Sequence, residues 1–166
     1  MNDDITPQHE EKLNKKKIRL VDFISFCMGF SQALLAYITS TYFKEALGME
    51  NIGVYYIAAY LVVLAILFNL HKLVKKCGKS HIFFASFIIK LFSLLFLIVM
   101  PPSLIGAVFL VVHMIFGALE VVALDIILES FSVDKMSGRV RGLYLTLLDA
   151  GFILGPLLSM STLENF

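Results

Sequence analysis

Residues 104–128 read LIGAVFLVVHMIFGALEVVALDIIL, a run of apolar side chains broken by only three ionisable groups, His113, Glu120 and Asp125. A helix rises about 1.5 Å per residue, so about 20 residues of this kind cross a hydrocarbon layer of about 30 Å. In lipid a helix satisfies its own backbone hydrogen bonds, whereas an open strand does not. The stretch therefore predicts a membrane-spanning helix.

Four further stretches resemble this run in length and composition. Together the five are Phe23–Phe43, Ile52–Leu70, Ile82–Met100, Leu104–Leu128 and Gly142–Leu163. Hydrophobic residues make up 58% of the chain and charged residues 16%, against about 25% charged in soluble domains. No run has the wide polar face that a soluble amphipathic helix needs. We therefore predict an all-α polytopic transmembrane helical bundle of five spans that lies in a lipid bilayer.

We expect a single domain, because no low-complexity linker divides the chain. The transmembrane domain is expected over residues 18–163, after a cytoplasmic polar and basic tail at 1–17 and before an outer-side end at 164–166. Paired prolines at 101 and 102 remove backbone donors, so the third span should end at or before Met100. The spans of the transmembrane domain are expected at about 20–43, 52–70, 82–100, 104–128 and 142–163.

Lysine and arginine gather in segments that would share one side of a membrane. Twelve of the 14 lie in the N-terminal segment and in two joints, His71–His81 and Glu129–Arg141, which we expect to be longer than the outer joints. Lys44 is the one base expected on the opposite side, and Lys90 lies inside a span. This bias predicts a multi-pass protein of the plasma (cytoplasmic) membrane with a cytoplasmic N-terminus.

Several functional classes have no support in the composition. The formal net charge of +1 gives no electrostatic basis for binding nucleic acid. The four histidines form no i, i+4 pair and no HExxH motif, so we expect no metal or other cofactor. No nucleophile–base pair is evident either, and we do not expect an enzyme.

Three charged residues lie at a similar expected depth in the membrane. Lys90, Glu120 and Asp149 are each about seven or eight residues from the cytoplasmic end of their span, or about 12 Å deep. A charge at membrane depth needs a partner or a wet cavity. One reading is a structural salt bridge between neighbouring spans. The other is a proton-coupling or substrate-binding carboxylate at Glu120 or Asp149.

His113, Gly117 and Glu120 follow i, i+4, i+7 spacing and so share one face of the fourth span. A histidine changes charge near neutral pH, and a glutamate two turns away could share its proton. A hydrogen bond from His113 to a neighbouring helix is the alternative.

Two further spans carry small or polar residues in a pattern. In the first span Gln32 belongs to a stripe with Ser25, Gly29, Ala36 and Thr39, which suits either a cavity or close helix packing. In the fifth span Pro156 bends the helix, while Gly151 and Gly155 allow a neighbour to approach closely. Such a helix suits a moving joint or a static kink.

The fifth-span motif resembles that of the major facilitator superfamily of secondary transporters, which reads GxxxGPxxGG. Gly151, Gly155 and Pro156 match its first half, whereas Ser159 and Met160 replace the closing glycines. Family members also carry an acidic residue near the end of span four and a loop that ends in Arg-Gly. The chain has Asp125 there, and Arg139, Arg141 and Gly142 fit the loop.

The joint after span two is similar to the family's GxxxD(R/K)xG(R/K)(R/K) at Lys76, Gly78 and Lys79. His71, Lys75 and Ser80 replace the first glycine, the aspartate and the last base, so the family's gating ion pair lacks its usual acid here. Span four of the family often carries an arginine four residues before a glycine. His113 holds that spacing before Gly117 with a titratable base.

The resemblance implies twelve spans in two halves, with the first and fourth spans lining the substrate path. Gln32, His113 and Glu120 then become cavity residues, and Lys90 on the peripheral third span becomes a structural partner of Glu120 or Asp149. We expect an N-terminal fragment of a secondary transporter that moves a small solute by alternating access, with proton coupling as an option. Its partner would be the missing C-terminal half. A non-transporting accessory or assembly protein that packs against a membrane partner is the alternative.

Overall fold

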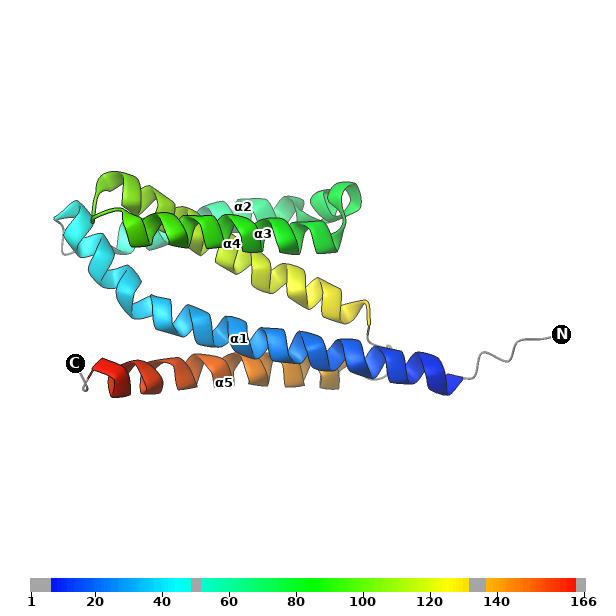
Figure 1. Cartoon of the computed structure of the whole chain (residues 1–166). Coiled ribbons are helices and arrows are strands. Elements are labelled where there is room, and N and C mark those ends of the chain that lie inside the picture. The colour runs from blue at the N-terminus through cyan, green and yellow to red at the C-terminus, as the bar shows by residue number, and fades with distance from the viewer. Residues whose placement is uncertain (1–6, 49–51, 132–136, 164–166) are drawn as a thin grey trace. The chain divides into compact units, whose positions relative to one another are not determined.

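The computed structural model describes the backbone of residues 7–48, 52–131 and 137–163, and the side chains of residues 15–36, 39–48, 52–131 and 138–156. Within these residues the regular structure is entirely helical (Figure 1). The helices are α1 (Pro7–Leu47), α2 (Gly53–Cys77), α3 (Lys79–Val99), α4 (Leu104–Glu129) and α5 (Ser137–Leu163).

Four helices in the described part of the chain are long and apolar enough to cross a membrane. They are Lys15–Leu47 within α1, and α2, α3 and α4 over their full lengths. The fifth predicted span, Gly142–Leu163, falls on α5, whose side chains beyond Pro156 lie outside the described residues. The all-helical, membrane-compatible fold is therefore confirmed, whereas the fifth span stays a prediction.

The joint between α2 and α3 is much shorter than the eleven-residue joint expected at His71–His81. Gly78 alone separates the two helices, with a φ of 82° and its N–H bonded to the carbonyl oxygen of Val74 at 2.9 Å. A positive φ suits glycine because it has no Cβ. The lysines around Gly78 extend the two helices instead of forming a loop, since lysine is a good helix former. The expectation of a long joint was wrong.

The turn between α3 and α4 follows the prolines as predicted. Helix α3 ends at Val99, one residue before Met100. Ser103 then accepts a hydrogen bond at its Oγ from the N–H of Gly106, at 3.2 Å. This is the geometry of an N-cap, which satisfies one of the free donors in the first turn of α4.

The chain divides into two compact units, and the divisions fall inside α1 and α4. The first unit comprises residues 1–33 and 124–166, and the second comprises residues 34–123. In the second unit one apolar cluster forms around Phe43, Ala107 and Leu110, and another around Ala59, Val63, Ile115 and Leu119. The second unit therefore holds α2, α3 and most of α4 against the end of α1.

In the first unit the beginning of α1 lies alongside α5 (Figure 1). Two glycines carry this contact: a Cβ added at Gly29 would overlap the carbonyl oxygen of Leu148, and one at Gly151 would overlap that of Phe26. The two backbones approach more closely than any side chain would permit, as in other small-residue helix pairs in membranes. For this part of the first-span stripe, the structure shows helix packing.

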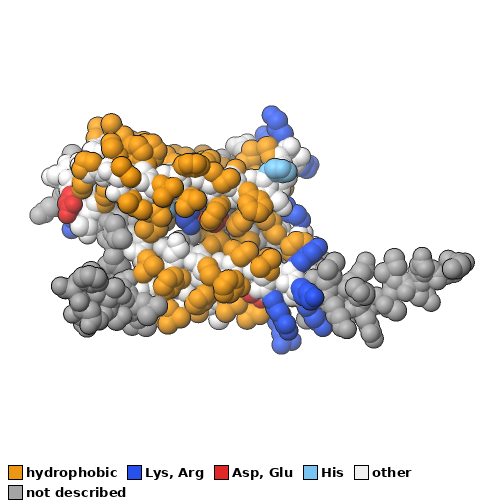
Figure 2. Space-filling view, viewed as in Figure 1, with side chains coloured by type: hydrophobic (Ala, Val, Ile, Leu, Met, Phe, Trp, Pro, Cys, Tyr) orange, Lys and Arg blue, Asp and Glu red, His pale blue; other side chains and the backbone are white. Residues whose placement is uncertain are grey.

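Hydrophobic side chains cover much of the coloured face in Figure 2, and many large ones are strongly exposed. Phe92, Ile98 and Val99 of α3 are 66%, 72% and 82% exposed. In water such a surface would cause aggregation, whereas in lipid it is the expected outer surface of a helical bundle. The exposure therefore fits a bilayer environment.

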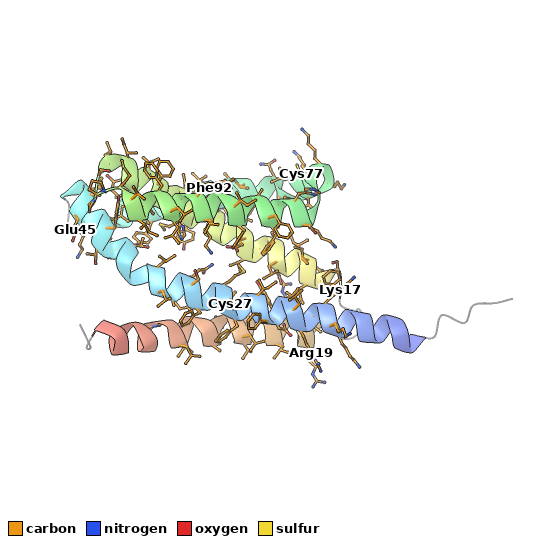
Figure 3. The ribbon with its side chains drawn as sticks, in the orientation of Figure 1. Lys17, Arg19, Cys27, Glu45, Cys77 and Phe92 are labelled. Atoms are coloured by element: carbon orange, nitrogen blue, oxygen red, sulfur yellow. The ribbon has the colours of Figure 1, made fainter. Side chains whose placement is uncertain are left out.

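Within the second unit, lysines gather at one end, and the opposite end carries few basic residues. Glu45 lies near the end of α1, and Cys77 lies at the opposite end of this unit, where α2 meets α3 (Figure 3). Lys72, Lys75, Lys76 and Lys79 all lie near Cys77 in the sequence, on the last turns of α2 and the start of α3. This separation is what a membrane orientation with one positive side requires.

Candidate functional site

Most of the buried polar residues of the second unit lie on α3 and α4. On α3 the buried positions include Ser86, Lys90 and Ser93, which follow i, i+4, i+7 spacing and so share one face. On α4 the buried polar residues are His113 and Glu120, on the face predicted from the sequence. The two faces meet at Lys90.

Lys90 and Glu120 form an ion pair in which Nζ lies 2.7 Å from Oε2. The two side chains are only 10% and 2% exposed. Charge-assisted hydrogen bonds of this length are strong, and a buried charge without its partner is costly. Of the two carboxylates considered for Lys90, the structure therefore pairs it with Glu120, and this pair ties α3 to α4.

His113 makes a second link between the same helices. Its Nδ1 lies 3.2 Å from the backbone carbonyl oxygen of Lys90. A carbonyl oxygen only accepts, so Nδ1 carries the proton and donates. His113 thus bonds to a neighbouring helix. This bond is the alternative that the sequence left open beside a proton relay with Glu120. Lys90 is held through both its backbone and its side chain.

Gly117 lies between these two contacts on α4. A Cβ at this position would be 3.9 Å from Cδ and 4.0 Å from Cε of Lys90, which is ordinary van der Waals contact. The lysine stem therefore passes over Gly117 on its way to Glu120. Together His113, Gly117 and Glu120 form a cradle for Lys90, and we call these four residues the Lys90 cradle.

The remaining candidates for a substrate or proton path belong to the first unit. Gln32 of α1 is half-buried and Asp149 of α5 is exposed. Gly151 and Gly155 are buried on α5, and Pro156 lies inside this helix. The structure thus brings together Lys90, His113 and Glu120 from the sequence-predicted set, in a unit to which Gln32 and Asp149 do not belong.

The residues chosen from the family's loop motifs are spread over both units. In the first unit Arg141 donates from Nη2 to Oδ2 of Asp125, which joins the start of α5 to the last turns of α4. Arg139 and Gly142 are exposed. In the second unit Lys76 is exposed on α2, Gly78 forms the joint, and Lys79 begins α3.

A buried carboxylate in the first unit was missed by the sequence analysis. Asp22 is 6% exposed, and among the described residues its Oδ1 is a buried atom without a hydrogen-bond partner. Ser25 is fully buried beside it, with Oγ donating to the carbonyl oxygen of Asp22 at 2.7 Å. Asp22 lies at the start of the predicted first span, where a carboxylate is expected to reach water at the membrane surface. Its spacing three residues before Ser25, at the start of the small-residue stripe, was the available signal.

Among the described residues, no group of three His, Cys, Asp or Glu side chains could hold a metal ion. The cradle is instead an ion pair between two side chains, with a histidine that bonds to the backbone.

No protein-family model, curated protein or solved structure matches this chain.

Proposed function

We propose that this chain is part of a secondary transporter of the major-facilitator type, which moves a small solute across a membrane by alternating access. The observation that carries the proposal is the ion pair between Asp125 and Arg141. The resemblance picked out these residues from separate motifs, at the end of span four and at the end of the following loop. Their contact supports a functional coupling between α4 and α5 that the motifs alone did not require.

In this proposal the Lys90 cradle provides proton coupling. Glu120 is held by Lys90 in a place that is almost closed to solvent. A proton delivered to Glu120 would cancel its charge and leave the Lys90 ammonium buried and uncompensated. An isolated charge at membrane depth is unfavourable, so the helices would rearrange to give Lys90 water or another partner. Proton binding and a change in α3–α4 packing are thereby linked.

The proposed orientation places the α2–α3 joint in the cytoplasm, and Cys77 offers a direct test. The chain has two cysteines, and both are exposed. In a Cys27→Ser background, we expect a membrane-impermeant maleimide to label Cys77 in inverted membrane vesicles and not in intact cells. Labelling after detergent lysis gives the total. Efficient labelling in intact cells would contradict the cytoplasmic N-terminus.

Transport is tested with proteoliposomes that contain the whole transporter to which this chain would belong and that enclose a pH-sensitive dye. Sugars, amino acids, carboxylic acids and organic cations are added outside in turn, and we expect one class to produce a pH change inside the vesicles. Glu120→Gln should abolish this change, because a neutral amide cannot exchange a proton. Glu45→Gln is the matched control, since Glu45 is exposed at the end of α1 (Figure 3).

Two results would argue against this assignment. A solute-driven pH change that is equal in Glu120→Gln and in the unchanged protein would remove Glu120 from the coupling step. No pH change and no solute uptake with any class, in correctly inserted protein, would favour the alternative of an accessory membrane protein.

A further inference from the structure

A groove of about 680 Å³ runs along the second unit between α2 and α4. Helix α4 contributes Phe116 and Leu119, and the other lining residues belong to α2. The α2 residues are Val62, Ala65, Ile66, Asn69, Lys72, Leu73 and Lys76. The groove lies apart from the Lys90 cradle, none of whose residues line it.

The groove is apolar along most of its length and basic at one end. Lys72 and Lys76 are spaced i, i+4, so both reach the same face of the last turns of α2. Both are exposed, and within the described residues neither has an acidic partner. Asn69 does not add a free polar group, because its Nδ2 donates to the carbonyl oxygen of Ala65 at 3.2 Å. An apolar trough thus ends in two uncompensated cations.

The length of the groove matches a single lipid leaflet. From Val62 to Leu73 a helix rises about 16 Å, and half of the hydrocarbon layer is about 15 Å. A transmembrane helix of a partner would instead need a contact surface over the whole layer. The basic end then lies where phosphate headgroups of the cytoplasmic leaflet lie, at the side already assigned from the lysine bias.

We propose that this groove binds an anionic phospholipid, with an acyl chain along α2 and α4 and the phosphate bound by Lys72 and Lys76. Basic sites at the cytoplasmic ends of membrane helices attract anionic headgroups in this way. The proposal depends on the membrane location of the chain and is independent of the transport activity proposed above.

The absence of tryptophan from the chain permits a site-specific test. Phe116→Trp places the only indole in the groove, and the protein is reconstituted in vesicles of phosphatidylcholine with a minor fraction of brominated lipid. Bromine quenches the indole when an acyl chain touches it. We expect brominated phosphatidylglycerol to bind at this position more tightly than brominated phosphatidylcholine, by about fivefold for each lysine that contacts the phosphate.

Matched variants separate the groove from general lipid contact. Lys72→Ala with Lys76→Ala should remove the preference, whereas Lys75→Ala should keep it, since Lys75 is exposed on the same helix but does not line the groove. Phe92→Trp reports bulk lipid, because Phe92 is exposed on α3 (Figure 3), and it should show no preference. If Phe116→Trp does not fold, Leu73→Trp probes the same groove.

Three results would overturn the proposal. Equal quenching by the two lipids at Phe116→Trp would show that the groove does not select an anionic headgroup. A preference of the same size at Phe92→Trp would show only a general attraction of the protein for anionic lipid. An indole that neither lipid quenches would show that protein covers the groove, as a second copy or another partner would do.

Discussion

Glu120→Ala is expected to lower the free energy of unfolding by about 3 kcal/mol, because it leaves the buried Lys90 ammonium without its partner. The Nζ–Oε2 distance of 2.7 Å and the 2% exposure of the Glu120 side chain mean that water cannot readily replace the carboxylate. Unfolding by a denaturing detergent in mixed micelles measures the change. Lys90→Ala should lower the free energy of unfolding by a similar amount, because it leaves the buried Glu120 carboxylate without its partner.

The double variant Lys90→Met with Glu120→Leu tests the cause of that loss. Exchanging a buried ion pair for apolar residues of similar volume is often neutral or stabilising, by about 1 to 4 kcal/mol. We therefore expect the double variant to be at least as stable as the unchanged protein, with a large coupling energy between the two positions. A double variant whose loss equals the sum of the two single losses would show that the pair does not hold α3 to α4.

Gly151→Ala is expected to destabilise the packing of α1 against α5 by about 1 to 3 kcal/mol, as overpacking does in close-packed interiors. The added methyl group would overlap the carbonyl oxygen of Phe26 and crowd the N–H of Phe30. Both are backbone atoms, so no side-chain rotation can relieve the contact and the helices must separate. Gly29→Ala should act in the same way, through the carbonyl oxygen of Leu148.

Gly142→Ala is the matched control for this second prediction. It lies on the same helix, and a Cβ there meets nothing within 4 Å. Alanine is the better helix former by about 1 kcal/mol, so this variant should be unchanged or slightly more stable. Detergent unfolding compares the three variants. Equal stability of Gly151→Ala and Gly142→Ala would mean that α1 and α5 do not approach each other this closely in the protein.

The helix ends show how far local sequence rules extend in this chain. Pro101 and Pro102 stop α3 within one residue of the expected place, because proline lacks an N–H and its ring excludes helical geometry before it. The lysines between His71 and His81 led to the wrong expectation of a long joint. They are polar in composition but good helix formers, and a single glycine with positive φ sufficed for the turn.

The face of α4 illustrates what periodicity can and cannot predict. The i, i+4, i+7 spacing of His113, Gly117 and Glu120 predicted a shared face, and the structure shows it. The spacing could not tell which partner each group would find. Lys90 comes from a helix whose rotation and height relative to α4 depend on the packing of whole side chains. The same holds for Asp22, whose burial left no mark in its own segment beyond the nearby Ser25.

The sequence by itself determined that the chain is helical and that most of its helices suit a bilayer, because about 20 apolar residues in a row have no other low-energy state in lipid. It also determined the end of α3 and the polar face of α4, both of which depend on residues close together in the chain. The tertiary structure alone decided that Lys90 pairs with Glu120, that Gly29 and Gly151 carry the α1–α5 contact, and that an apolar groove ends at Lys72 and Lys76. These features join residues of different helices, and helix packing, which no local pattern specifies, places them together.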